Sequence, residues 1–345
     1  MREIVMASMR KGAGKTSMIV GIGRALGRKI GYMKPFGDRL LYRKKRLWDY
    51  DSALISNIFG LDASPEDVSL GFDHAKLSFM DDAAEVQRRV VEAAERIGKG
   101  RDLVFIEGGR DMSYGASVHM DPVSIARCTK ATMFAVVDGD GTLVLDDISF
   151  LGTYVAVPGV SFGGVIVNKV RDLAEFREFT LPRVEEMGIP VVGVVPFEHE
   201  LTYLSVGYIA EGLFAKVITG EQSMGRSVKT LTIGAMSQNA ALESPLLKKR
   251  DILVITSGDR SEIIIIALEN NASAVLLTND ILPPPNIIAL AEEKKVPLLL
   301  VPFDTYETAR QVDGMMPLLG KDETGKIDLL TELAKKHVRL EAFAG

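Results

Sequence analysis

The chain has little of three things that often define a protein's class: cysteine, long apolar runs and positive charge. Its 345 residues include one cysteine, Cys128, which excludes an internal disulfide framework and is interpreted as a small packed thiol. The longest apolar run, residues 263–268, is far shorter than the ~20 residues that a membrane-spanning helix needs. The formal net charge of −5 argues against general nucleic-acid binding. Because no signal peptide is visible at the N-terminus, we expect a cytoplasmic protein with neither a membrane nor a nucleic-acid partner.

The hydrophobic pattern predicts an α/β protein. Short continuous apolar runs, rich in β-branched residues, alternate with segments whose apolar residues recur at helical spacing. Such runs are typical of a parallel sheet that helices cover on both faces. We expect strands at 4–7, 30–33, 103–106, 133–137, 165–167 and 191–195, and helices at 15–26 and 83–97.

A polar stretch at residues 219–228 divides the chain, and the alternation of strands and helices then restarts. The pattern predicts two domains, 1–222 and 223–345, the second one smaller. In the second domain we expect strands at 231–233, 252–256, 274–278 and 298–301, and helices at 236–249, 261–270, 286–294 and 326–339.

The segment that follows the first predicted strand resembles a phosphate-binding loop. Its Gly-Lys-Thr tripeptide, Gly14 to Thr16, stands between a strand and a helix, and Gly12 adds a second glycine, although Met9 replaces the first glycine of the Walker A pattern. Glycines allow backbone N–H groups to surround phosphate oxygens at the positive end of a helix. We expect Lys15 to neutralise the β- and γ-phosphates and Thr16 to ligate Mg²⁺. The predicted loop contacts are Gly12, Ala13, Gly14, Lys15, Thr16 and Ser17.

Two carboxylates and a basic segment accompany this loop. Glu107 ends a predicted strand, and the carboxyl edge of such a sheet is where ligands bind. Asp51 precedes an apolar helix and is either a metal ligand or the N-cap of that helix, and the two roles do not exclude each other. The basic residues of segment 39–46 form either a mobile loop over the phosphates or a solvated loop.

Together these motifs resemble the dethiobiotin synthetase family, within a P-loop group that includes cobyrinic acid a,c-diamide synthases. The resemblance spans residues 1–215 and implies ATP and Mg²⁺ as ligands, with a homodimer as the expected assembly. It implies that Thr16, Asp51 and Glu107 hold Mg²⁺ and that Lys34, in the segment 31–35, acts with Lys15 at the γ-phosphate. It further implies that Asn168 reads adenine and that Pro196 lies in the loop that lines the base.

A closer resemblance is to the N-terminal part of long bacterial phosphate acetyltransferases, in which such a domain precedes a DRTGG domain. The matching segments are 255–261, 274–278, 296–297 and 304–309, with Ser261 and Glu262 in place of Thr-Gly-Gly. Acetyltransferase activity is not expected, because the sequence ends at Gly345. Four polar residues, Asp259, Arg260, Asp304 and Thr305, follow predicted strands, where they either form a regulatory pocket or cap helices.

Three functional hypotheses remain open. The first is a Mg²⁺-dependent ATPase or ATP-binding protein with a regulatory second domain. The second is an ATP-dependent ligase of the carboxylase or amidoligase type, acting on a small carboxylate or amine. The third is a non-enzymatic nucleotide sensor that works through a dimer or a partner. Ser8 to Lys11 replace the Gly-Thr-Asp-Thr of dethiobiotin synthetases, and the cations Arg10 and Lys11 suit an anionic ligand or a nucleotide across a dimer.

Overall fold

The computed structural model describes residues 1–43, 46–80, 82–139, 143–155, 157–236, 243–245 and 247–344, which form two compact units. The first unit combines residues 1–198 with the C-terminal segment 324–345, and the second consists of residues 199–323. The sequence placed one boundary near residue 222 and assigned everything after it to the second domain. The structure differs because β10 (Lys216–Thr219) pairs within the second unit, whereas the C-terminal helix α15 (Thr324–His337) packs on the first.

The predicted parallel sheet is present in the first unit. In the described part of the chain it has six strands in the order β2-β5-β1-β6-β7-β8, and every neighbouring pair is parallel. Each strand matches one of the apolar runs, because a strand covered on both faces needs apolar side chains in both directions. The strands are β1 (Arg2–Ser8), β2 (Ile30–Met33), β5 (Leu103–Glu107), β6 (Thr132–Asp138), β7 (Ser161–Val170) and β8 (Val191–Pro196).

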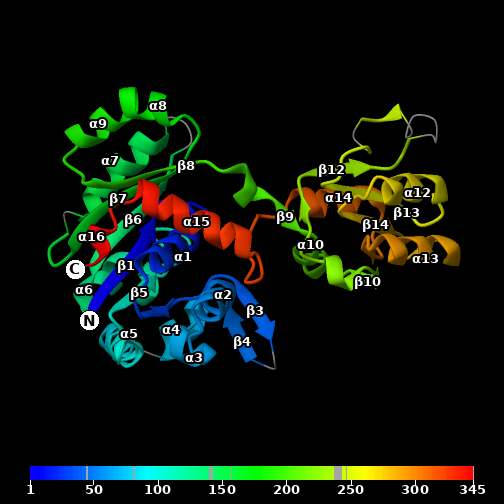
Figure 1. Ribbon diagram of the computed structural model, residues 1–345. Coiled ribbons are helices and arrows are strands. Elements are labelled where there is room, and N and C mark those ends of the chain that lie inside the picture. The colour runs from blue at the N-terminus through cyan, green and yellow to red at the C-terminus, as the bar shows by residue number, and fades with distance from the viewer. Residues whose placement is uncertain are drawn as a thin grey trace. The chain divides into compact units, whose positions relative to one another are not determined.

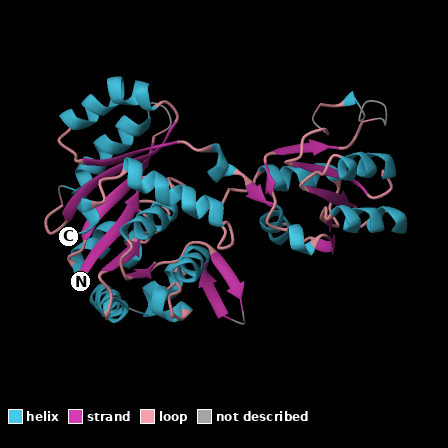
Figure 2. Ribbon diagram, in the orientation of Figure 1, coloured by secondary structure: helices cyan, strands magenta, loops and turns pink. Residues whose placement is uncertain are grey.

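Helices cover both faces of this sheet (Figure 2). One face packs on α5 (Ala83–Gly98), α6 (Pro122–Thr129) and α7 (Leu143–Val155). The other face packs on α1 (Lys15–Leu26), and the two ends of the chain meet there, because the red α15 lies along the blue α1 (Figure 1). The shorter helices are α2 (Tyr50–Phe59), α3 (Pro65–Val68), α4 (His74–Met80), α8 (Leu173–Glu175), α9 (Leu181–Glu186) and α16 (Glu341–Ala344).

The basic segment after Lys34 forms part of a hairpin. Strand β3 (Leu40–Arg43) pairs antiparallel with β4 (Arg46–Asp49), and α2 follows directly. Lys44 and Lys45, which belong to the predicted loop over the phosphates, lie outside the described residues. The sequence did not predict the two strands, since they expose Leu40, Tyr42 and Leu47 and carry few buried residues.

The second unit is a smaller α/β layer. Its described strands lie in the order β10-β15-β14-β13-β12, parallel except for β10, which is antiparallel at one edge. Half of the helix expected at 236–249, residues 237–242 and 246, falls outside the described residues. The remaining strands are β12 (Thr230–Ile233), β13 (Ile252–Ser257), β14 (Ala274–Thr278) and β15 (Leu298–Leu300), with the short pair β9 (Leu204–Ser205) and β11 (Ser227–Val228). The helices are α10 (Val206–Gly212), α12 (Ser261–Glu269), α13 (Pro285–Lys294) and α14 (Thr305–Asp313).

Among the described residues, no helix is both long enough and apolar enough to span a membrane.

Candidate functional site

The predicted phosphate loop joins β1 to α1 at the carboxyl edge of the sheet. Gly12 and Gly14 have φ values of 80° and 100°, in the left-handed region that side chains disfavour. Gly14 is the N-cap of α1 and has no side chain to satisfy the first N–H groups of the helix. Ala13 is buried behind the loop, and Ser17 is half-buried in the first turn. The unsatisfied amides and the positive end of α1 therefore point at one place, where an anion is favoured.

Lys15 begins α1, and its ammonium lies across the loop. Nζ donates to Ser8 Oγ at 2.7 Å and to the Arg110 carbonyl at 3.4 Å, and only 8% of the residue is exposed. Burial lowers the pKa of Lys15 because the charged form loses water. A phosphate beside Nζ would reverse this effect, since an anion favours the ammonium form.

Thr16 and Glu107, two of the residues predicted to hold Mg²⁺, are in contact. Thr16 Oγ1 donates to Glu107 Oε1 at 2.9 Å, and the Tyr32 hydroxyl donates to Oε2 at 2.9 Å. Burial, and then the negative charge of Asp51, raise the pKa of Glu107 to about 7. Tyr32 was not singled out in the sequence, although it stands two residues before Lys34 and thus on the same side of β2.

Lys34 follows β2 and is enclosed by three carboxylates. Its ammonium contacts Asp38, lies 2.6 Å from Asp51 Oδ2, and lies 3.4 Å from Asp49 Oδ2. The oxygens of these three acids lie within 4.8 Å of one another, so the lysine balances part of a concentrated negative charge. Burial opposes the charged form of Lys34, but Asp51, Glu107 and the other acids raise its pKa well above the ordinary value.

Asp49, and not Asp51, caps the helix that follows them. Asp49 is the N-cap of α2 and accepts from the Ser52 amide at 3.1 Å, so the N-cap alternative for Asp51 is wrong. Asp51 stands in the first turn instead and faces Lys34, with Arg39 at 3.5 Å on its other oxygen. Burial alone would raise the pKa of Asp51, but Lys34 and Arg39 hold it below the ordinary value. The charged form of the Asp51 carboxylate is therefore favoured.

Residues near the C-terminal end of β7 contact the phosphate loop. The Asn168 amide donates to the Ala13 carbonyl at 2.9 Å. The Lys169 ammonium donates to the Gly12 carbonyl at 2.7 Å and to Asp138 Oδ2 at 3.0 Å. Pro196 ends β8, which pairs with β7 at this same edge. The structure thus brings Asn168 to the loop itself.

Arg10 is held against α7. Its Nε donates to both oxygens of Asp147, at 3.0 and 2.8 Å, while half of its side chain stays exposed. Asp147 was not predicted from the sequence, because a carboxylate in a helix usually faces solvent, but this one is 6% exposed. Lys11, the other cation before the loop, is exposed.

In the second unit, the four candidate residues have separate structural roles. Asp304 accepts from the Glu307 amide at 2.8 Å and caps α14, so its cap alternative is confirmed. Asp259 does not cap α12, whose N-cap position is Arg260. The Arg260 guanidinium bonds to the Met236 carbonyl at 2.6 Å and to Glu262 at 3.1 Å. Thr305 Oγ1 lies 3.1 Å from Thr278 Oγ1, which brings together a hydroxyl at the start of α14 and one at the end of β14.

Comparisons with known proteins agree with this arrangement. Residues 2–204 match the AAA domain family, and residues 208–315 match the DRTGG domain. A phosphate acetyltransferase of Nitrosomonas europaea is 26% identical over 99% of this chain and 51% of its own length. A cobyrinate a,c-diamide synthase of Listeria innocua is 28% identical over 57% of this chain and 40% of its own length. The chain spans about half the length of the phosphate acetyltransferases that it matches.

Solved structures show weaker similarity. The MinD cell division protein of Aquifex aeolicus has a TM-score of 0.36 at 18% identity, covering 58% of this chain and 84% of that chain. A second solved structure contains the CBS and DRTGG domains of the regulatory region of a Clostridium perfringens pyrophosphatase, complexed with the activator diadenosine tetraphosphate. Its TM-score is 0.30 at 23% identity, and the match covers 34% of this chain and 51% of that chain.

The family matches confirm the predicted order of a dethiobiotin-synthetase-like P-loop domain followed by a DRTGG domain.

Proposed function

Because the chain belongs to the AAA domain family of P-loop proteins and continues into a DRTGG domain, we propose that it is a Mg²⁺-dependent ATP-binding protein with a regulatory second domain. The observation that carries this proposal is the contact of 2.9 Å between Thr16 and Glu107 at the N-terminus of α1. It joins a hydroxyl and a carboxylate beside a loop whose amides favour phosphate.

The residues present fit a magnesium ion. Thr16, Glu107 and Asp51 offer hydroxyl and carboxylate oxygens, which are the ligands that Mg²⁺ prefers. A bound Mg²⁺ would neutralise phosphate charge. Glu107 would lose its proton as the cation arrives, and Thr16 would turn its hydroxyl away from Glu107.

Lysines supply the remaining positive charge. In this proposal Lys15 exchanges the Ser8 hydroxyl for phosphate oxygens, regaining a partner that favours its ammonium form. Lys34, positioned by Asp38, Asp49 and Asp51, stabilises negative charge at the γ-phosphate. Asn168 and Pro196 are proposed to contact the adenine side of the nucleotide, on the basis of their place at the same sheet edge.

Isothermal titration of the full chain with ATP and with GTP, each with and without Mg²⁺, tests the proposal. Lys15→Ala is expected to weaken ATP binding by at least ~100-fold, because a charged hydrogen-bonding partner of the phosphates is lost. Lys99→Ala is the matched control, since Lys99 is an exposed lysine beyond the end of α5. Absence of ATP binding, or equal binding by the two variants, would reject the proposal.

A ligase that activates a small carboxylate with ATP is the second candidate function. It is favoured by the similarity to a cobyrinate a,c-diamide synthase over 57% of the chain. It predicts ATP turnover that rises with one small carboxylate or amine and that Lys34→Ala abolishes. A sensor would instead bind ATP with negligible turnover under every substrate tested, and with a nucleotide-dependent change in assembly.

A regulatory role is proposed for the second unit on the basis of its DRTGG match and the paired hydroxyls of Thr278 and Thr305. Adenine nucleotides would be titrated into the full chain carrying Lys15→Ala, in which the first site is weakened. Binding that remains would indicate a second site, proposed to lie in residues 199–323. Thr305→Val is expected to weaken that binding without changing the first site.

A further inference from the structure

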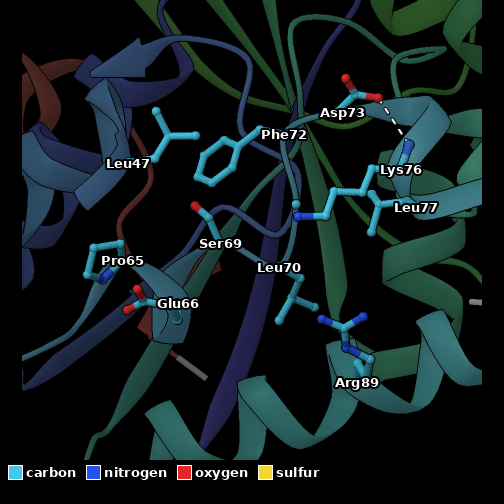
Figure 3. Close-up of a pocket in the computed structure, with 11 residues that line it drawn as sticks. Leu47, Pro65, Glu66, Ser69, Leu70, Phe72, Asp73, Lys76, Leu77 and Arg89 are labelled. Atoms are coloured by element: carbon cyan, nitrogen blue, oxygen red, sulfur yellow. Dashed lines mark hydrogen bonds between the residues drawn. The ribbon is translucent and has the colours of Figure 1, made fainter. Parts of the chain in front are cut away.

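A cavity of about 460 Å³ lies in the first unit, and none of the nucleotide-site side chains lines it. Its walls come from β4, α3, the segment 69–73, α4 and α5 (Figure 3). Pockets for small molecules usually measure roughly 300–1,000 Å³, so this cavity is large enough to enclose a ligand.

Most of the lining is apolar. Leu47, Leu70, Phe72 and Leu77 face the cavity from different elements (Figure 3). Gly71 allows the wall to approach α4, because a Cβ at this position would lie 2.7 Å from Leu77 Cδ1. Leu77 is 4% exposed, so α4 is packed in place and the apolar wall is fixed.

Positive charge is present at one side of this apolar space. Lys76 of α4 is an exposed residue that points its ammonium into the cavity (Figure 3). A second cation, Arg89 of α5, also lines the cavity.

The two acidic residues that line the cavity, Asp73 and Glu66, each interact with another group. Asp73 accepts from the backbone amide of Lys76 at 3.1 Å, and Glu66 lies 3.8 Å from Arg46. Neither carboxylate therefore balances the Lys76 ammonium. An apolar cavity with a cation at its exposed edge favours a ligand that has an anionic end and an apolar body.

We propose that this cavity binds a small amphipathic carboxylate, with its aliphatic chain among Leu47, Leu70 and Leu77 and its carboxylate at Lys76. Such a site goes beyond the proposed nucleotide function and does not depend on it. Ser69, which is 5% exposed and lies 3.4 Å from Ser52 through its hydroxyl, provides a further polar group on the wall.

The wall of the cavity is continuous with the backbone that positions Lys34. The Lys34 amide donates to the Val68 carbonyl at 2.8 Å, and the Leu70 amide donates to the Pro35 carbonyl at 2.8 Å. The Gly37 amide donates to the Gly71 carbonyl at 3.0 Å. A ligand in the cavity would thus contact the segment that is hydrogen-bonded to residues 34–37.

The test uses the full chain without nucleotide and octanoate as the probe. Trp48, the one tryptophan in the sequence, follows Leu47 on β4 and reports on that wall by fluorescence. Octanoate is expected to bind saturably and more tightly than octan-1-ol. Affinity should rise about fourfold per methylene through the series butyrate, hexanoate and octanoate, as expected for burial of a methylene group.

Lys76→Met removes the charge and keeps the apolar stem, and Lys99→Met makes the same change at an exposed lysine away from the cavity. Lys76→Met is expected to weaken octanoate binding at least tenfold and leave octan-1-ol unchanged, while Lys99→Met changes neither. Failure of octanoate to saturate, equal affinity for the alcohol, or equal octanoate affinity in the two variants would overturn the proposal. An ATP titration of the same samples tests the nucleotide site separately.

Discussion

Glu107 is a buried carboxyl group whose only described hydrogen bonds come from the hydroxyls of Thr16 and Tyr32. Its pKa of about 7 means that, without a cation, the group is largely protonated in mildly acidic solution. In the proposed site, Mg²⁺ would displace this proton, because metal ligation requires the carboxylate. Mg²⁺-dependent ATP affinity is expected to fall by about tenfold per pH unit below pH 7. Titration calorimetry from pH 5.5 to 8.5, in buffers of different ionisation enthalpy, would measure the affinity and the proton released.

The raised pKa of Glu107 also predicts how the stability of the ligand-free protein depends on pH. Its folded-state pKa lies above the ordinary 4.5, so the protonated form is favoured in the folded state. This contribution is fully present below pH 4.5 and is lost as pH rises towards 7. Glu107→Gln should remove that part of the decline in the free energy of unfolding between pH 4.5 and 7, as measured by urea titration. An unchanged decline would show that Glu107 does not titrate there.

Two loop glycines provide a matched pair of substitutions. A Cβ at Gly14 would lie 2.4 Å from the Asn168 amide nitrogen, whereas a Cβ at Gly12 would have no heavy atom within 4 Å. Both positions have positive φ, so alanine costs about 1 kcal/mol at either one. Gly14→Ala should weaken ATP binding at least tenfold more than Gly12→Ala, because it also displaces Asn168. Calorimetric affinities decide this, with thermal unfolding confirming that both variants fold.

At the scale of elements, the packing of α15 on α1 depends on Gly21. A Cβ at Gly21 would lie 2.5 Å from the Leu330 carbonyl, so the two helices approach each other through this position. Gly21→Ala is expected to destabilise the chain by about 2 kcal/mol through overpacking, although alanine is the better helix former. Gly152 in α7 has its nearest atom at 3.9 Å, so Gly152→Ala should stabilise by about 0.5–1 kcal/mol. Two changes of the same sign in the urea midpoint would contradict this account.

How far the sequence predicted these elements depends on the kind of signal that each one carries. The strands of the first sheet were predictable because they are continuous apolar runs, and α1 and α5 because their apolar residues have helical spacing. The edge strand β10 was not, since Lys216 and Thr219 make it look like a polar connector. Helical periodicity predicted α15, but it shows only that one face is buried and does not say which partner covers that face.

In the candidate site, too, local sequence patterns predicted some contacts and could not predict others. The proximity of Thr16 and Glu107 was predictable from their motifs, because Glu107 ends β5 and Thr16 follows the loop after β1, and the parallel pairing of β1 and β5 brings these positions to one sheet edge. The ring of Asp38 and Asp49 around Lys34 depends on the path of segment 34–51, which no local pattern specifies. Asp147 likewise becomes a partner of Arg10 only through the packing of α7.

On the scale of the whole molecule, the first unit is made from two separate stretches of chain, and the second unit is the segment between them. The C-terminal segment, residues 324–345, is hydrogen-bonded to the first sheet and also packs on one face of it. The Arg339 amide donates to the carbonyl of Val192, a residue of β8, at 2.8 Å. Phe343 is fully buried and stacks on Phe134 of β6 with centroids 4.3 Å apart. A chain cut after residue 323 would therefore expose the apolar faces of α1 and β6.

This construction predicts opposite results for two deletions. Removal of residues 324–345 should abolish cooperative unfolding of the first unit and ATP binding, because α1 carries Lys15 and Thr16 and would lose the helix that covers it. Replacement of residues 199–323 by a flexible Gly/Ser linker should retain both, because that unit has its own hydrophobic core and the phosphate loop belongs to the first unit. Circular dichroism melts and ATP calorimetry on the two deletions decide the matter. If the C-terminal deletion binds ATP as the full chain does, the nucleotide site is complete within residues 1–198, and α15 contributes nothing to it.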